Sequence, residues 1–389
     1  VCCLPPAHCL LIDLVTGEIR EKRYWDLKFR EDKSLGFEDW LTRLDDAVRE
    51  AVRLRLVSDV PFGAFLSGGI DSSLVVGYMA DIMEQPVKTF SIGFENADYS
   101  ELEYAKKVAE ICRTEHHTQI VKAESLKILP DLVRHYGQPF ADSSAIPTYY
   151  VSRMARDNVK MVLSGDGGDE NFAGYNTYEY IVSRQPKCGK TGFAELLKRY
   201  ALKWCRRDKT SCKLNEKSSE VFQLYSMVYN HFPPQERTEL YKAKYGRLVD
   251  EEQSFRRRIV KNGEGPLLSR LQLLDILTYL PYDILTKVDI ASMMHGLEVR
   301  TPIVDVRVAE FAATIPSALN LNWAPGRGWE GKLLLKQVMH RTFPPAFLSR
   351  RKMGFAVPIA RWFAPQGALY DFVRERLLGT FGVELLAPC

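Results

Sequence analysis

A polar loop containing two glycines and one aspartate is the first stretch whose residue types and spacing could do chemistry. It has the sequence SGGIDSS over residues 67–73 and follows an apolar run that ends at Leu66. Glycines let backbone N–H groups approach an anion, and the helix expected next directs its positive end to the same place. The candidate anion-binding residues are Ser67, Gly68, Gly69, Asp71, Ser72 and Ser73.

The aspartate inside this loop restricts the kind of anion that it can hold. Asp71 would repel phosphates unless a cation lay between them, and Mg²⁺ favours one or two carboxylates together with phosphate oxygens. No lysine follows the glycines as in a Walker loop, and the Gly-x-Gly-x-x-Gly spacing is also absent. The loop therefore predicts a site for the pyrophosphate part of a nucleoside triphosphate with Mg²⁺. A capped helix start would explain a single serine or Asp71, but not two glycines among three hydroxyls.

A second glycine-rich loop, LSGDGGDENFAGY over residues 163–175, also follows an apolar run. Its acids Asp166, Asp169 and Glu170 are close in sequence, which is unfavourable unless cations or a positively charged reactant compensate them. We expect Asp169 to join Asp71 on the metal. The spacing of acids in a calcium-binding EF-hand is absent.

A lysine at the start of a later helical stretch is the third candidate. Lys332 opens the segment KLLLK, and a cation delivered to a metal–phosphate site would stabilise charge that grows during phosphoryl or adenylyl transfer. From the residues alone, Lys332 could equally be a surface lysine.

The elements that must position these residues alternate between strands and helices. Strands are expected over residues 60–66, 87–94, 116–121 and 159–163. Helices are expected over residues 37–57, 71–83, 100–112 (with Ser100 as N-cap), 125–136 and 145–156, and from about residue 218 onward over 267–285, 304–315 and 331–342. This alternation predicts an α/β fold with a doubly wound parallel sheet, and both glycine loops should lie at the carboxyl edge of the sheet. Before it, a hairpin is expected to turn at Thr16-Gly17.

Composition and charge exclude several classes of protein. The 389 residues are 46% hydrophobic with a net charge of +4, so neither a nucleic-acid nor a membrane partner is predicted. No secretory leader is visible, and the eight cysteines lack the spacing of a disulfide framework, which favours the cytoplasm. Cys188, Cys205 and Cys212 could hold zinc, although reduced thiols fit their spacing better. The basic stretch 184–217 fits a solvated insertion better than a polyanion site.

Several blocks resemble one family when they are taken together in order. They are FLSGGIDSSLV, SIGFENADYSELEYAKKVAE, LSGDGGDENFAGY, LPYDILTKVDIASMMHGLEVRTPIVD, GKLLLK and FLSRRKMGFAVPIARWF. Between about Ser58 and Phe363 the chain resembles the glutamine-hydrolysing asparagine synthetases, which are N-type ATP pyrophosphatases of the PP-loop, or adenine nucleotide alpha hydrolase-like, class. The resemblance implies that the β-carboxylate of aspartate attacks ATP, that β-aspartyl-AMP and pyrophosphate form, and that ammonia then yields asparagine and AMP.

The resemblance also implies a role for each matching residue. The first loop would grip the pyrophosphate, Asp71 and Asp169 would hold Mg²⁺, and Lys332 would stabilise the adenylation transition state. Leu66 and Ile92 would border the adenosine, whereas Ser164, Gly165 and Asp166 would lie along ATP and the intermediate. Asp166 stands where many members have Glu, Ile290 where Arg is common, and Ser143 where Pro is usual, so the acceptor acid stays open between aspartate and another carboxylate.

The resemblance divides the chain into two parts. Residues 1–29 look like the end of the family's glutaminase domain, and residues 37–389 like its ATP-binding synthetase domain. The family's catalytic N-terminal cysteine is absent, so this chain is not expected to hydrolyse glutamine by itself. The family commonly forms homodimers. Three rival hypotheses remain. They are a related amidotransferase that acts on another carboxylate, as in exopolysaccharide-associated systems, a ring-closing synthetase of the β-lactam or lasso type that needs no added ammonia, and a non-catalytic ATP-binding domain.

Overall fold

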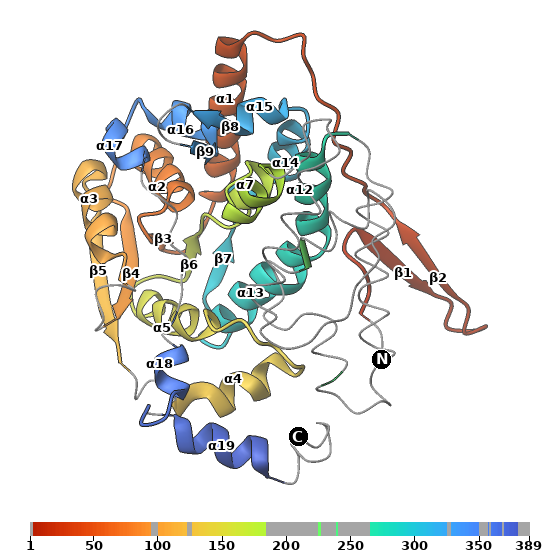
Figure 1. Cartoon of the computed structure of the whole chain (residues 1–389), viewed down its shortest axis with the longest axis vertical. Helices are drawn as coiled ribbons and strands as arrows, with labels where there is room; N and C mark the ends of the chain where they lie inside the picture. Colours follow the sequence, from red (N-terminus) through yellow and green to blue (C-terminus); the bar gives the residue numbers. More distant parts are fainter. Residues whose placement is uncertain are drawn as a thin grey trace, which may run out of the picture.

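A five-stranded parallel sheet lies at the centre of the computed structural model, which describes residues 3–94, 100–122, 127–183, 225–226, 239, 265–324, 328–349, 357, 359–367 and 369–379. Its strands are β3 (Phe62–Phe65), β4 (Lys88–Phe94), β5 (Glu115–Val121), β6 (Met161–Leu163) and β7 (Glu298–Arg300). They are arranged in the order β5-β4-β3-β6-β7 and every neighbouring pair is parallel (Figure 1).

The strand order reverses between β3 and β6. From β3 the chain moves outward through β4 to β5, whereas β6 and β7 lie on the other side of β3. Ala64 pairs with Leu163, so the ends of β3 and β6 lie side by side. A reversal of this kind opens a crevice beyond the carboxyl ends of the two strands, where ligands bind in doubly wound sheets. The predicted fold class and the shared edge for the two glycine loops are both confirmed.

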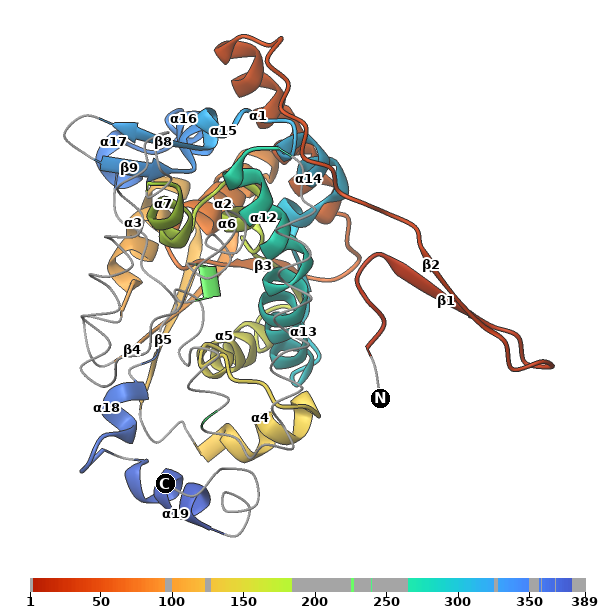
Figure 2. The same ribbon diagram turned by 45° about the vertical axis from the view of Figure 1, so that its right-hand side comes forward.

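Helices cover the sheet and carry the candidate residues. Before the gap at residue 184 they are α1 (Phe37–Arg55), α2 (Ile70–Ile82), α3 (Leu102–Cys112), α4 (Leu129–Tyr136), α5 (Ala145–Arg156), α6 (Gly168–Asn171) and α7 (Asn176–Val182). From residue 265 on they are α12 (Leu267–Leu277), α13 (Thr286–Met293), α14 (Val306–Ala312), α15 (Ser317–Asn320), α16 (Leu333–Met339), α17 (Pro345–Leu348), α18 (Ile359–Phe363) and α19 (Tyr370–Leu378). In Figures 1 and 2, α2 and α16 lie near the same end of the sheet.

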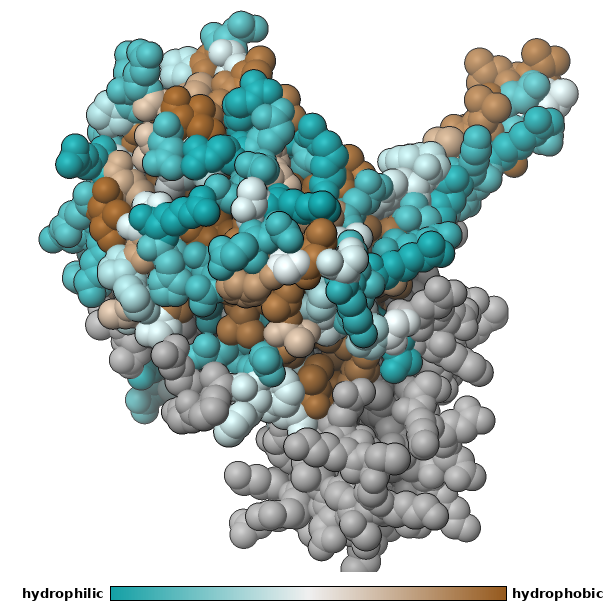
Figure 3. Space-filling model, turned by 90° about the horizontal axis from the view of Figure 1, so that it is seen from above, coloured by the Kyte–Doolittle hydropathy of each residue, from teal (hydrophilic) through white to brown (hydrophobic). Residues whose placement is uncertain are grey.

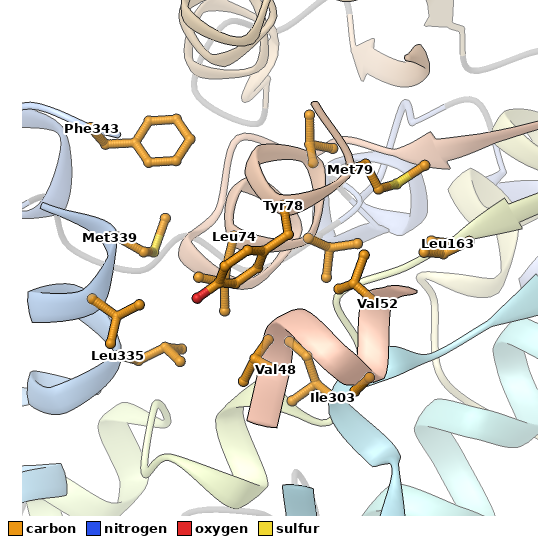
Figure 4. Close-up of a cluster of buried hydrophobic side chains, with 14 of the residues drawn as sticks. Val48, Val52, Leu74, Tyr78, Met79, Leu163, Ile303, Leu335, Met339 and Phe343 are labelled. Atoms are coloured by element: carbon orange, nitrogen blue, oxygen red, sulfur yellow. The ribbon is translucent and has the colours of Figure 1, made fainter. Parts of the chain in front are cut away.

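A buried apolar cluster joins the helices that carry the catalytic candidates. Val48 and Val52 of α1 pack with Leu74 of α2 and with Leu335 and Met339 of α16 (Figure 4). The apolar positions of α1 recur at helical spacing, which turns one face of the helix toward this cluster. Because burial of such side chains contributes roughly 1.5–3 kcal/mol each, the cluster holds α2 and α16 firmly against the sheet.

The region after residue 265 differs from the helical expectation in three places. A short strand, β7, adds the fifth position of the sheet, and β8 (Leu321–Ala324) and β9 (Gly328–Gly331) form an antiparallel hairpin. The helix expected over 267–285 ends at Leu277, and residues Leu280–Leu285 form a π-helix that contains Pro281. Proline lacks the N–H that a regular helix needs at this point, so the hydrogen-bonding pattern changes.

The expectation that Ser100 caps the third helix is wrong. The N-cap is Glu101, whose carbonyl accepts hydrogen bonds from the backbone N–H groups of Tyr104 and Ala105. No side-chain cap forms at this helix start. A serine before two acids is a typical cap signal, but a shift of one residue lies within the usual uncertainty of helix ends.

A two-stranded hairpin projects from the body of the molecule (Figures 2 and 3). Strands β1 (His8–Ile12) and β2 (Ile19–Arg23) are antiparallel, and Gly17 at the predicted turn has a φ of +72°. Its apolar residues Leu14 and Val15 are exposed. Within the described residues, no helix is long and apolar enough to cross a membrane. The insertion 184–217, with Cys188, Cys205 and Cys212, lies outside the described residues.

Candidate active site

A cavity of about 1570 Å³ opens at the carboxyl edge of the sheet, where the two glycine loops face each other. Most of the candidate residues line it, namely Leu66, Ser67, Gly69, Asp71, Ser72, Ile92, Ser164, Gly165, Asp166, Asp169 and Lys332. The structure thus brings together residues that are up to 266 positions apart in the chain. Such a concave site at a switch point is the expected place for a nucleotide.

Gly68 and Ser73 do not line this cavity. Gly68 has a φ of +75°, and a Cβ atom built on it would lie 2.5 Å from the backbone nitrogen of Ala105 in α3. Ser73 is fully buried at the start of α2. The glycine at position 68 is therefore required for the close approach of the loop to α3, and direct contact of these two residues with an anion stays a prediction.

The first loop is braced by its own hydroxyl groups. The Oγ atoms of Ser67 and Ser72 lie 3.0 Å apart, and the backbone N–H of Gly69 donates to Ser67 Oγ at 3.1 Å. Helix α2 begins directly after Gly69 and runs for 13 residues. Its first N–H groups and the positive end of its dipole are therefore positioned by the loop that precedes it.

Lys332 joins the two acidic loops. Its Nζ donates a hydrogen bond to Asp71 Oδ2 and lies 2.7 Å from Asp169 Oδ1. Only 6% of the residue is exposed, so the alternative of a surface lysine is wrong. Burial by itself would lower the pKa of Lys332, but the carboxylates of Asp169 and Asp71 outweigh burial and raise it. The ammonium is therefore charged throughout the physiological pH range.

The same two aspartates fit the requirements of Mg²⁺. They lie against one cation, Lys332, on the wall of the cavity, and no described residues form a cluster of three or more metal-ligating side chains. Two carboxylates without further protein ligands suit Mg²⁺, which takes its other ligands from water and from substrate phosphates. A Cβ atom on Gly168 would lie 2.3 Å from Asp71 Cγ, so the second loop is in contact with the first acid.

Asp166 lies in the second loop, beside a serine that orients it. Ser164 Oγ donates to Asp166 Oδ2 at 2.7 Å, and the Ser164 backbone N–H donates to the carbonyl of Arg300 in β7 at 2.9 Å. Burial raises the pKa of the Asp166 carboxyl, whereas the hydroxyl of Ser164 and the charge of Lys287 act in the opposite direction.

Two further pairs of residues line the cavity, and of these four residues only Glu170 was singled out from the sequence. Tyr175 donates a hydrogen bond to Glu170 Oε1 at 2.6 Å, and burial raises the pKa of Glu170 to about 8. Lys287 lies 2.8 Å from Asp142 on another part of the wall. Glu170 and Tyr175 lie in the second glycine-rich loop, whereas no short motif could join Asp142 and Lys287, which are 145 positions apart. For Lys287, its location in a block shared with the family was the available signal, and Asp142 lies outside those blocks.

The residues that depart from the family pattern differ in their placement. Ser143 lines the cavity. Ile290 lies in α13 and packs, partly buried, against the apolar cluster that contains Leu297 and Val162. The side chain at position 290 therefore contributes apolar packing here, in place of the positive charge of an arginine.

Comparison with known proteins identifies the family of the chain. A family model described as asparagine synthase matches residues 43–381. "Asparagine synthetase [glutamine-hydrolyzing] 1" of Bacillus subtilis is 32% identical over 92% of this chain and 56% of its own length. "Putative asparagine synthetase [glutamine-hydrolyzing]" of Mycobacterium tuberculosis is 31% identical over 82% of this chain and 48% of its own length. This chain thus spans about half the length of these relatives.

Similarity extends more weakly to other proteins. "Amidase chyE" of Penicillium rubens is 24% identical over 95% of this chain and 60% of its own length. NMN synthetase of Francisella tularensis, a solved structure, overlaps with a TM-score of only 0.29 at 15% identity over 66% of this chain and 97% of that one, so the fold class rests on the strand order itself. Because the family model covers most of its residues, the chain belongs to the asparagine synthase family.

Proposed function

We propose that this chain is an ATP-dependent amide synthetase that adenylates the β-carboxylate of aspartate and transfers the aspartyl group to ammonia. The observation that carries the proposal is the meeting of Lys332 with Asp71 and Asp169, between two glycine-rich loops at the switch point of the sheet. Two acids and a buried lysine on the wall of this cavity suit the transfer of a nucleotidyl group better than binding alone.

The first half-reaction forms a mixed anhydride. An oxygen of the β-carboxylate bonds to the α-phosphorus of ATP, and the bond from that phosphorus to the pyrophosphate oxygen breaks. In this proposal the N–H groups at the start of α2 and the hydroxyls of Ser67 and Ser72 hold the departing pyrophosphate. Mg²⁺, held by Asp71 and Asp169, would neutralise phosphate charge. Lys332 would compensate the charge that grows on the leaving oxygens.

The second half-reaction forms the amide. The ammonia nitrogen bonds to the carbonyl carbon of β-aspartyl-AMP, the bond from that carbon to the AMP oxygen breaks, and the nitrogen loses a proton. Leu66, directly after β3, and Ile92, within β4, are buried on the cavity wall, where they suit contact with the adenosine. Ser164, Gly165 and Asp166 follow β6 on the same edge and suit contact with the α-phosphate and the acyl group.

One product assay tests this proposal. The chain is incubated with ATP, Mg²⁺, ammonium and aspartate, and asparagine, AMP and pyrophosphate are measured by mass spectrometry and a coupled assay. Equal amounts of the three products are expected. Release of ADP and phosphate would refute the proposal, as would an Asp71→Asn variant that forms the products at the wild-type rate. Replacing ammonium by glutamine tests whether the chain needs ammonia from elsewhere.

A second candidate function shares the adenylation but differs in the acceptor. The similarity to a fungal amidase and the residues Asp166 and Ile290 favour keeping it. Here the carboxylate belongs to another acid, or the attacking amine lies in the same molecule and closes a ring. Acid-dependent pyrophosphate release without any need for ammonium would select ring closure.

The remaining features of the proposal come from the family resemblance. We propose that residues 1–29 belong with an ammonia-supplying glutaminase part and that residues 37–389 form the synthetase part. A homodimer and a cytoplasmic location are proposed on the same grounds. Analytical ultracentrifugation of the chain tests whether it forms a homodimer.

A further inference from the structure

The ammonium group of Lys287 lines the cavity on a different helix from Lys332. Lys287 lies in α13, and only 8% of the residue is exposed. Its Nζ donates a hydrogen bond to Asp142 Oδ2 at 2.8 Å. A lysine ammonium has three donors, so hydrogen-bonding capacity remains for a ligand in the cavity.

The partner of Lys287 is itself held rigidly. Asp142 Oδ1 accepts hydrogen bonds from the backbone N–H of Ser144 at 2.8 Å and from its Oγ at 2.7 Å. The backbone carbonyl of Lys287 accepts a hydrogen bond from the hydroxyl of Tyr136 at 3.0 Å. Asp142, Ser144 and Lys287 are therefore positioned before any ligand arrives, as a specific binding site requires.

The charges around Lys287 favour a ligand with both a positive and a negative group. Asp142 is paired with Lys287, and its charge together with burial raises the pKa of the neighbouring Asp283 to about 7. Asp166 lies within electrostatic range of both Lys287 and Asp169. This part of the wall thus presents the ammonium of Lys287, with donors that Asp142 does not use, and the carboxylate of Asp166 toward the metal-binding acids.

We propose that Lys287, held by Asp142, is a specificity-determining residue that binds the α-carboxylate of the acceptor amino acid while the acid's other carboxylate is adenylated. The identity of the acceptor rests on the function proposed above. In this arrangement Asp166 faces the α-ammonium group of the acceptor, and Lys332 lies at the reacting end.

The test compares two acids that differ only in the group that Lys287 would bind. β-Alanine is aspartate without its α-carboxylate. Each acid is assayed by acid-dependent exchange of pyrophosphate into ATP and, without turnover, by calorimetric binding in the presence of AMP. The variants are Lys287→Met, the double variant Asp142→Asn/Lys287→Met, which leaves no unpaired charge, and Lys160→Met as the control at an exposed lysine outside the cavity.

The wild type and Lys160→Met are expected to prefer aspartate. Lys287→Met should lower the binding affinity and kcat/KM for aspartate about 10- to 100-fold, because the loss of a hydrogen bond to a charged group costs roughly this factor. The affinity and kcat/KM for β-alanine should change by less than about 3-fold. The double variant should lose the same selectivity and keep the wild-type circular dichroism spectrum, which separates recognition from misfolding.

Three results would overturn this inference. The first is that Lys287→Met lowers the affinity for aspartate and for β-alanine equally, and the second is that it changes neither affinity. The third is that the wild type shows no preference for aspartate, because it binds neither acid or binds both equally. A wild type without aspartate-dependent exchange refutes the proposed function alone, because the binding measurement still decides the role of Lys287.

Discussion

The close contact around Gly174 offers the sharpest test of the site geometry. A Cβ atom at this position would lie 2.0 Å from Asp169 Oδ1 and 2.0 Å from Lys332 Cε. Ordinary van der Waals contact begins at 3.4 Å, so a methyl group would be about 1.4 Å too close to each atom. The φ angle of Gly174 is not positive, so Gly174→Ala perturbs the site through contact and not through backbone strain.

The displacement predicts a loss of activity that is larger than the loss of stability. Moving a catalytic group by about 1 Å can cost 100-fold in rate, whereas overpacking a buried position costs typically 1–3 kcal/mol of unfolding free energy. Gly174→Ala should therefore lower kcat for aspartate-dependent pyrophosphate release at least about 100-fold. The folded fraction at 25 °C should remain high.

The assay follows pyrophosphate release at saturating ATP and aspartate, with unfolding in urea measured in parallel. The matched control is Gly77→Ala in α2, where the added methyl would lie in ordinary contact with the Phe343 ring at 3.4 Å and with Thr342 Cγ2 at 3.9 Å. That substitution should keep the activity and, because alanine suits a helix better, raise stability by roughly 0.5–1 kcal/mol. A folded Gly174→Ala enzyme with activity within twofold of the wild type would refute the placement of Lys332 and Asp169 at the reacting phosphate.

Three further predictions concern charge. Lys332→Met should lower pyrophosphate release about 10²- to 10³-fold in a steady-state assay while the apparent KM for aspartate changes little, since its cation acts on the transition state. Asp305 forms charged hydrogen bonds with Arg55 and Arg307 outside the cavity, so Asp305→Asn should lower the unfolding free energy by about 2 kcal/mol in urea and leave kcat unchanged. Burial and the charge of Asp142 raise the pKa of Asp283 to about 7 in the folded protein, so the folded state binds a proton at Asp283 more tightly than the unfolded state does. The stabilisation from this proton is complete below about pH 4 and is lost as the pH rises through 7. Asp283→Asn should remove that loss, and a stability difference from the wild type that is constant between pH 4 and 8 would contradict it.

The layout of the sheet could be predicted from the sequence because its signals are local. The apolar runs before residues 67 and 164 are strands, and the strand–helix alternation was enough to place both loops at one edge. Strand β7 was not predicted, since Glu298–Arg300 is three residues long and contains two charged side chains. It is a strand because β6 offers it a free edge, and a short window of sequence does not contain that information.

The contacts between the site residues could not be predicted from local sequence, because they depend on tertiary structure. Lys332 has no local signal that distinguishes it from a surface lysine, and only the family resemblance assigned it a catalytic role. Its φ of +56° is uncommon for a residue with a side chain. The hydrogen bond from its backbone N–H to the carbonyl of Phe172 ties this conformation to the second loop, which is far away in the sequence.

The glycines near the site allow segments of the protein to approach one another, in addition to letting phosphates approach the backbone. A Cβ atom on Gly168 would lie 2.3 Å from Asp71, and one on Gly331 would lie 2.2 Å from the carbonyl oxygen of Ala173. These glycines let three segments of the protein approach one another, so that Asp71, Asp169 and Lys332 meet. The same close contacts hold the two acids and the lysine at one edge of the cavity. The preorganised charge, more than any single residue, is what the proposed adenylation would draw upon.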